Sequence, residues 1–326
     1  MKFGVYITGA CGQSKSLYLA RNEEKRGRGS SQSVFEQIKK DTSFLIEKQK
    51  NMGFSFTMDP MFLFYDLLQP FAEKTPRVKP GPQENWFNNN TFYRRPQIHA
   101  PLESLPKGFM NEYLHKDLLS ECPSPMAILP SPYTLFSLSE AFGYSNKKEA
   151  ILDIASIIKD EAQKLVKNGF SRIQFDEPAI VMRQSLDSIN EEEIELFQLG
   201  IKQVAPIKGA SVCLHTYFGN AAPLIPILKK LPVDCIGIDC SETRMEDIAA
   251  SQFEDLELSL GLINSRTPAM EDPKDLIDKA KEIQKSVKAK RLWITPNTGL
   301  EYIGWTFGNE KLAILEKVKR GLENEI

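Results

Sequence analysis

The sequence lacks any apolar stretch long enough to cross a membrane. Its start, Met1–Gln13, holds a short apolar run that Gly9 and Gly12 interrupt, and no later segment approaches the roughly 18 apolar residues of a membrane helix. We therefore expect neither an export signal nor a membrane span.

Positive charge is not in excess either. Lysine and arginine number 41 against 43 aspartate and glutamate residues, so the formal net charge is -2. A protein that holds a phosphate backbone needs a positive surplus, and this chain offers none. We expect no nucleic-acid partner.

Cysteine is sparse and its pattern is irregular. In a chain of 326 residues, an odd number of cysteines without a C-x-x-C pair indicates reduced thiols rather than a disulfide framework. The expected location is cytoplasmic. The five cysteines are Cys11, Cys122, Cys213, Cys235 and Cys240.

Short runs rich in β-forming residues recur at about eight places along the chain. They are Phe3–Thr8, Phe54–Met58, Met126–Leu129, Arg172–Phe175, Ser211–His215, Asp234–Asp239, Glu257–Leu262 and Leu292–Thr295. Amphipathic stretches typical of helices lie between most of them, and several begin with a capping Asp, Asn or Ser. These stretches are Val34–Met52, Lys148–Asn168, Glu191–Val204, Asp272–Lys288 and Asn309–Asn324.

This alternation of strand and helix predicts a parallel sheet. Strands that are hydrophobic almost throughout indicate a sheet covered on both faces. With 41% hydrophobic residues in 326, the sequence predicts an α/β fold, a (β/α)8 TIM barrel, as one domain over residues 1–326. An open doubly wound sheet is the alternative.

One segment, at about residues 70–106, does not follow the alternation of strand and helix, because it is rich in proline, asparagine and aromatic residues. It contains the runs Pro76–Pro82 and Asn88–Pro96. A loop of this length in a compact domain is usually functional or forms a small hairpin. We predict an extended loop or hairpin inserted after the second strand.

Polar residues follow several of the predicted strands. In a barrel of this kind the residues after each strand converge on one rim, which carries the active site. Asp176-Glu177-Pro178 follows the fourth strand, and His215–Gly219, Asp239–Glu242 and Pro296–Gly299 follow the fifth, sixth and eighth. A histidine, carboxylates and hydroxyls in one concave mouth suit small-molecule binding or acid–base chemistry.

Each of these groups also has a structural interpretation. The paired acids Asp176 and Glu177 could cap the following helix, and His215 could be a hydrogen-bonded structural group. Near the start, Gly9–Ser16 is similar to a phosphate loop but lacks the adjacent Gly-Lys-Ser/Thr, so we do not expect nucleotide binding.

Taken together, the strand-end segments resemble cobalamin-independent methionine synthase, a family whose members are built from two related barrels in tandem. No single segment is decisive, and their combination makes the resemblance specific. They appear in the family's order over nearly the whole chain: Tyr65–Phe71, Asn90–Pro96, Ser131–Thr134, Ile173–Ala179, Leu214–Gly219, Leu231–Asp234, Leu258–Gly261 and Leu292–Leu300.

The family's catalytic barrel holds zinc with a His-x-Cys pair, a glutamate and a second cysteine. In this chain His215 matches the histidine, Tyr217 and Thr298 stand at the two cysteine positions, and Asp239 stands at the glutamate position. One strong ligand and one shortened carboxylate are too few for a tetrahedral site, so bound zinc is doubtful. A rearranged zinc site that uses His215 and neighbouring cysteines stays open.

The segments instead resemble the family's amino-terminal barrel, which has lost zinc ligands and helps to hold the folate. The resemblance implies a component of methionine synthesis, in which 5-methyltetrahydrofolate polyglutamate donates a methyl group to homocysteine. A separate zinc-bearing barrel would then be the partner. Two alternatives remain: a self-sufficient homocysteine or thiol methyltransferase with a rearranged zinc site, and a non-catalytic binding barrel.

The resemblance also implies roles for individual residues. Asp176 is expected to engage the amino group of the amino-acid substrate, and Glu177 and His215 complete the candidate catalytic set. Cations on the long loop either contact the anionic folate tail, since guanidinium groups pair with carboxylates, or are solvated. The candidate substrate-binding residues are Tyr93, Arg94, Arg95, Tyr217, Asp239, Asn297 and Thr298, with Arg77 and Lys79 as further loop cations.

Overall fold

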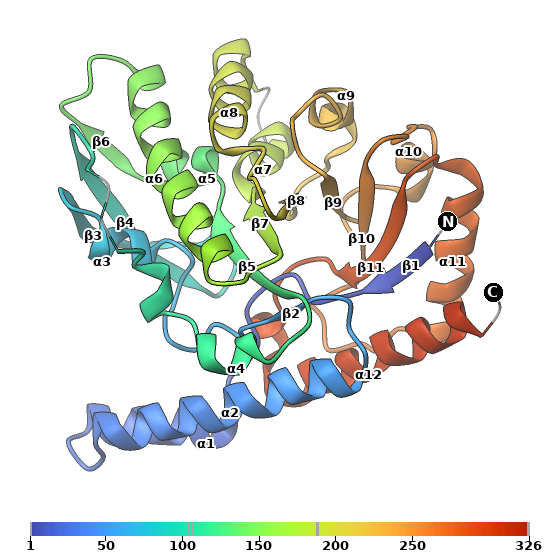
Figure 1. The fold of residues 1–326 in the computed structure, drawn as a ribbon, viewed down its shortest axis with the longest axis horizontal. Coiled ribbons are helices and arrows are strands. Elements are labelled where there is room, and N and C mark those ends of the chain that lie inside the picture. Colours follow the sequence, from blue (N-terminus) through green and yellow to red (C-terminus); the bar gives the residue numbers. More distant parts are fainter. Residues whose placement is uncertain (1, 104, 106, 187–188, 325–326) are drawn as a thin grey trace.

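A curled sheet of eight parallel strands forms the centre of the computed structural model, which describes residues 2–103, 105, 107–186 and 189–324 (Figure 1). The strand order is β1-β11-β10-β9-β8-β7-β5-β2. The Ser55 amide donates to the Val5 carbonyl at 2.9 Å, which joins β1 to the segment that precedes β2. The strands are β1 (Lys2–Val5), β2 (Thr57–Met58), β5 (Pro125–Pro130), β7 (Arg172–Asp176), β8 (Ser211–Thr216), β9 (Cys235–Asp239), β10 (Glu257–Ile263) and β11 (Arg291–Pro296).

The predicted (β/α)8 architecture is thus confirmed, and two predicted strands are shorter than expected. β1 ends at Val5 rather than at Thr8. Thr8 instead contacts the loop after β11 through its side chain. The Thr8 hydroxyl donates to the Pro296 carbonyl at 2.9 Å. The second strand is reduced to Thr57–Met58, which pairs with β5.

Helices cover the outside of the sheet, and the predicted ones are present with small shifts. The last helix begins at Gly304 instead of Asn309, because a short 3-10 helix, η3 (Leu300–Ile303), leads directly into it. The helices are α1 (Lys15–Lys25), α2 (Ser31–Asn51), α3 (Gln69–Lys74), α4 (Lys116–Ser120), α5 (Pro132–Ser137), α6 (Lys147–Lys167), α7 (Pro178–Leu186), α8 (Glu191–Val204), α9 (Ile225–Leu228), α10 (Met245–Ala249), α11 (Pro273–Ser286) and α12 (Gly304–Glu323), with η1 (Met110–Glu112) and η2 (Ala222–Leu224).

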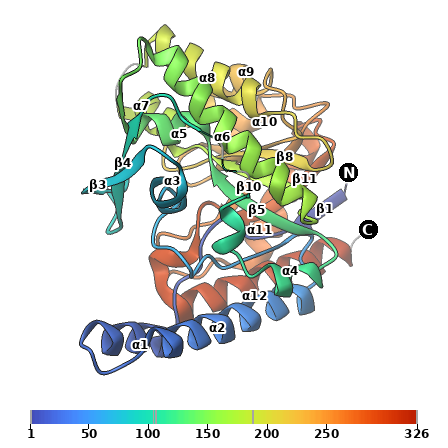
Figure 2. The ribbon, with the colours of Figure 1, turned by 60° about the vertical axis from the view of Figure 1, so that its left-hand side comes forward.

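The pair α1 and α2 extends away from the sheet as a long helical hairpin (Figures 1 and 2). The inner end of α2 is fixed to α12, because the Lys48 ammonium donates to the side chain of Asn309 at 2.6 Å. Neither α1 nor its contacts with the rim were predicted from the sequence.

The inserted segment contains an antiparallel hairpin, β3 (Val78–Asn85) and β4 (Phe92–His99). β6 (Glu140–Phe142) pairs with β4, which gives a second sheet of three strands at one side of the molecule (Figures 1 and 2). The hairpin turn reaches the loop after β8, where the rings of Phe87 and Phe218 are 6.1 Å apart. The insertion therefore helps to enclose the rim.

No helix in the described part of the chain is both long and apolar enough to cross a membrane. All five cysteines lie in the described part and are unpaired.

Candidate functional site

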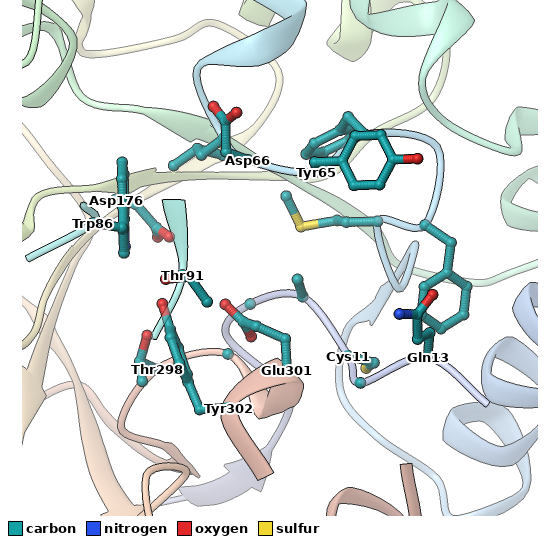
Figure 3. A pocket seen from close by; sticks show the side chains of 18 of the residues that line it. Cys11, Gln13, Tyr65, Asp66, Trp86, Thr91, Asp176, Thr298, Glu301 and Tyr302 are labelled. Carbon is teal, nitrogen blue, oxygen red and sulfur yellow. The ribbon is translucent and has the colours of Figure 1, made fainter. Parts of the chain in front are cut away.

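A cavity of about 260 Å³ opens at the carboxyl ends of the strands (Figure 3). Its walls come from the loops after β1, β2, β7, β8 and β11 and from the turn of the β3–β4 hairpin. Carboxyl groups and aromatic rings face the same space. The residues with most bearing on its chemistry are Arg21, Trp86, Asp176, Tyr217, Glu301 and Tyr302.

Asp176, the last residue of β7, lines this cavity and is almost fully buried. Its carboxyl accepts hydrogen bonds from the Gln174 amide at 2.8 Å and from the Tyr217 hydroxyl at 3.2 Å. Burial raises the pKa of Asp176 well above its ordinary value, although these two donors oppose the rise. Burial therefore favours the protonated form of this carboxyl, and a bound cation would favour release of the proton.

Glu301 is a further acid in the cavity, besides Asp66 and Asp176, and it was not among the site residues predicted from the sequence. It lies on η3, three residues beyond Thr298. Burial raises its pKa to about 7, while a hydrogen bond from Tyr302 acts in the opposite direction. The position of this carboxyl requires glycine at Gly299, since a Cβ atom there would lie 1.9 Å from Oε2 of Glu301.

Aromatic rings enclose the space near the two acids. Tyr217 and Tyr302 come from the loops after β8 and β11, and Trp86 comes from the hairpin turn. Figure 3 shows Trp86 beside Asp176 and Tyr302 beside Glu301. The inserted hairpin thus contributes to the cavity through its turn.

Arg21, from α1, is the positively charged residue of the cavity wall. Its guanidinium group donates to the Gln13 side chain at 3.0 Å and to the Phe62 carbonyl at 2.5 Å. It also lies 4.9 Å from the centre of the Tyr65 ring. Figure 3 shows Gln13 and Asp176 on different sides of the cavity, and the acid Asp66 follows Tyr65 in the chain.

The loop cations predicted to bind the folate tail lie outside this cavity. Arg95 pairs with Glu84 at 3.1 Å and with Glu140 at 3.6 Å, and the Tyr93 hydroxyl donates to Glu84 at 3.1 Å. These contacts hold the small sheet together. Arg94 is exposed and lines a neighbouring depression of about 460 Å³ with Tyr93 and Lys25.

Two further loop cations were predicted either to contact the folate tail or to be solvated. Arg77 forms an ion pair with Glu103 at 3.3 Å, and Lys79 is exposed on β3. Neither lines the main cavity.

Glu177 points away from the cavity although it is adjacent to Asp176. Its carboxyl accepts hydrogen bonds from the Thr134 hydroxyl at 2.9 Å, from the Ile180 amide at 2.9 Å and from the Ser131 hydroxyl. Burial raises the pKa of Glu177 to about 7. The geometry is that of a cap at the start of α7 that also fixes α5, and a catalytic role for Glu177 stays a prediction.

His215 lies beneath the rim in a buried hydrogen-bond network. Its Nε2 atom is 2.9 Å from the Asn297 carbonyl, and burial lowers its pKa to about 4, so the ring is neutral with its proton on Nε2. The other nitrogen, Nδ1, packs against Gly237 and has no partner in the described structure. Neither nitrogen offers a lone pair toward the cavity.

Asp239 and Asn297 belong to the same network. The Asp239 carboxyl accepts from the Phe218 amide at 3.2 Å, the Ser241 amide at 2.9 Å and the Asn297 side chain at 3.0 Å. Of the four positions matched to the family's zinc ligands, Tyr217 and Thr298 line the cavity, whereas His215 and Asp239 do not.

The nearby cysteines do not complete a metal site. Cys213 lies within the barrel, with its sulfur 3.8 Å from the Tyr6 hydroxyl, and the Cys240 sulfur lies 3.6 Å from the Ile238 carbonyl. Within the described ranges, no three His, Cys, Asp or Glu side chains are grouped so as to hold a metal ion. Because the Asp239 oxygens are already engaged and the unpartnered Nδ1 of His215 faces Gly237 rather than the cavity, this arrangement does not fit zinc.

Comparison with known proteins identifies the family. Residues 71–288 match the family model described as "Cobalamin-independent synthase, N-terminal domain". A protein from Sulfurisphaera tokodaii named methionine synthase is 25% identical over 323 residues, covering 98% of this chain and 92% of the relative. The chain belongs to the cobalamin-independent synthase family, a family of methyltransferases, and matches the amino-terminal domain as the resemblance predicted.

Solved structures agree on the fold. A B12-independent methionine synthase from Shewanella sp. W3-18-1, determined in complex with selenomethionine, has a TM-score of 0.73 at 18% identity, with 91% of each chain covered. A methyltransferase from Methanosarcina mazei has a TM-score of 0.60 at 12% identity and covers 98% of this chain and 95% of its own. At these identities the comparison supports the architecture alone.

Proposed function

We propose that the chain is a substrate-binding component of cobalamin-independent methionine synthesis. In this reaction a methyl group passes from 5-methyltetrahydrofolate, carrying its polyglutamate tail, to homocysteine. The chain would act in the cytoplasm with a separate zinc-bearing barrel of the same family.

The observation that carries the proposal is the composition of the rim cavity. Asp176 lies where the resemblance expects the group that engages an amino-acid amine, and it faces the cavity with Tyr217 and Thr298. Aromatic rings together with carboxyl groups and the Arg21 guanidinium suit an amphoteric organic substrate. The name of the Sulfurisphaera relative supports the same reaction.

The need for a partner follows from thiol chemistry. A free thiol has a pKa of about 8.5, and transfer of a methyl group needs the thiolate. A zinc ion would stabilise that thiolate, whereas the nearby carboxyls Asp176 and Glu301 disfavour a second negative charge. This cavity therefore suits substrate binding better than activation of the homocysteine sulfur.

Isothermal titration calorimetry with 5-methyltetrahydrofolate triglutamate and L-homocysteine tests the proposal. We expect the wild-type chain to bind both compounds, and Asp176→Asn to weaken homocysteine binding by about tenfold or more, because a charge-assisted hydrogen bond is lost. The matched control is Asp255→Asn, since the Asp255 side chain is 96% exposed. If the wild-type chain bound neither compound, the alternative of a non-catalytic barrel unrelated to these substrates would replace the proposal.

A further inference from the structure

Three carboxyl groups line the cavity. Asp66 accepts hydrogen bonds from the Leu68 and Gln69 amides, whereas Asp176 and Glu301 have no cation paired with them in the described structure, because Arg21 in the same wall donates to Gln13 and Phe62. Asp176 comes from β7 and Glu301 from η3, and the charge of Glu301 contributes to the raised pKa of Asp176. Among the described residues, no lysine, arginine or histidine forms an ion pair with either acid. Like charges in one buried space oppose ionisation of both groups, and a cation bound between them would relieve that repulsion.

One oxygen of this pair also lacks a hydrogen-bond donor. Oε2 of Glu301 is buried and has no partner in the described part of the molecule. Such an acceptor costs free energy when it is left unsatisfied. Glu301 lines the cavity while its Oε2 atom faces Gly299, so a rotation of the carboxylate toward the cavity would let a ligand supply the missing donor.

The aromatic residues around Glu301 also favour binding of a cation. Tyr217 and Tyr302 line the same cavity, and Trp86 lies beside Asp176 (Figure 3). Aromatic faces attract ammonium groups, most strongly where water is excluded. Carboxylates and rings in one enclosure are a typical receptor for an organic cation.

We propose that Glu301 is a specificity-determining residue, which together with Asp176 holds the protonated amino group of the ligand and selects α-amino acids over analogues that lack this group. This inference rests on the proposed function, because it concerns the amino-acid substrate of the same cavity. Homocysteine and methionine both carry the required ammonium group.

Binding of the ammonium group is coupled to loss of a proton. The pKa of Glu301 in the empty cavity is about 7, so below pH 7 the carboxyl must release its proton to solvent before it pairs with the cation. Affinity therefore rises with pH up to about 7 and then levels off. The other titratable groups that line this cavity are Cys11, Arg21, Tyr65, Asp66, Asp176, Tyr217 and Tyr302. Burial raises the pKa of Asp66 to about 6, so this carboxyl acts in the same direction as Glu301.

These neighbouring groups do not reverse the direction of the expected pH dependence of binding. Burial raises the pKa of Tyr217, Tyr302 and Cys11, so all three stay neutral around pH 7. Asp176 acts in the same direction as Glu301, because its pKa is raised as well.

The test measures binding of L-methionine and of 4-(methylsulfanyl)butanoate, its analogue without the amino group, by calorimetry at pH 6, 7 and 8. We expect the wild-type chain to prefer L-methionine by about tenfold or more. Glu301→Gln should remove most of this preference and flatten the pH dependence, whereas Glu301→Asp should retain the preference in part. Glu310→Gln, on the exposed face of α12, is the matched control and should bind as wild type.

Equal affinity for the two compounds, or an unchanged L-methionine affinity in a folded Glu301→Gln variant, would overturn the inference. Titration of the same samples with 5-methyltetrahydrofolate separates it from the proposed function. If the folate binds and L-methionine does not, the inference about Glu301 fails and the proposed function stands. If L-methionine binds through Glu301 but a zinc-bearing partner yields no methyl transfer, the proposed function fails and the inference stands.

Discussion

Replacement of Glu177 by alanine should destabilise the fold without altering the cavity. The change removes the acceptor for the Ile180 amide and for the hydroxyls of Thr134 and Ser131. A buried donor without a partner costs about 1–3 kcal/mol, but a hydroxyl can rotate to another acceptor. The Ile180 amide, at about 1–3 kcal/mol, and one hydroxyl, at about 1 kcal/mol, therefore set the expected loss of unfolding free energy at about 2–4 kcal/mol.

Urea unfolding followed by tryptophan fluorescence measures this loss. With a slope of about 3 kcal/mol per molar urea, the midpoint of Glu177→Ala should fall by about 1 M. Glu177→Gln retains one carbonyl acceptor and should fall about half as far. Asp176→Asn should leave the midpoint unchanged or raise it, because removing a charge from a functional cavity often stabilises a protein. If Glu177→Ala were as stable as wild type but lost substrate binding, Glu177 would act in the cavity and our interpretation of it as a cap would be wrong.

Three further predictions concern the site. The unfolding free energy should fall as pH rises from about 4.5 to 7, because Glu301 binds a proton more tightly in the folded chain, where its pKa is about 7, than at its ordinary value of 4.5. Thermal melts of Glu301→Gln should show a smaller fall, and an identical pH profile would refute this assignment. Elemental analysis of the chain purified without chelator or affinity metal should find well below one zinc per chain. About one zinc per chain, lost in His215→Ala, would establish the self-sufficient enzyme with a rearranged site. Trp86→Ala should weaken L-methionine binding, measured by calorimetry on the folded variant, by several-fold, and it should also lower stability because the Trp86 side chain is buried against Phe87 and Tyr93. An unchanged affinity would show that the hairpin turn does not contact the ligand.

The sequence predicted the barrel because most of the buried strands are rich in hydrophobic residues, although β7 carries Arg172 and Gln174 at buried positions. β5, β7 and β9 are buried at every position, and short buried strands of this kind can be recognised from the sequence without tertiary information. The shortened β1 and β2 were not predictable in this way. Their ends depend on contacts with the loop after β11, which lies far away in the sequence, through bonds such as that of the Thr8 hydroxyl to Pro296.

The candidate site was predicted in part. Asp176, Tyr217 and Thr298 follow strands directly, and all three line the cavity. His215 and Asp239 also follow that rule, but their side chains are directed into buried networks, and strand position does not reveal side-chain partners.

Other cavity residues had weaker signals. Glu301 lies just beyond the Pro296–Gly299 segment, on η3, so its distance from the strand end hides its place in the cavity. Arg21 and Trp86 come from α1 and from the inserted hairpin, whose docking on the rim depends on tertiary packing.

Methyl transfer from 5-methyltetrahydrofolate triglutamate to L-homocysteine, measured as methionine formed, tests the central claim most directly. The assay compares this chain alone, a zinc-bearing barrel of the same family alone, and the two together. Our account predicts no turnover by this chain alone and a rate for the mixture well above that of the zinc-bearing barrel. Turnover by this chain alone, or a mixture no faster than the zinc-bearing barrel, would contradict it.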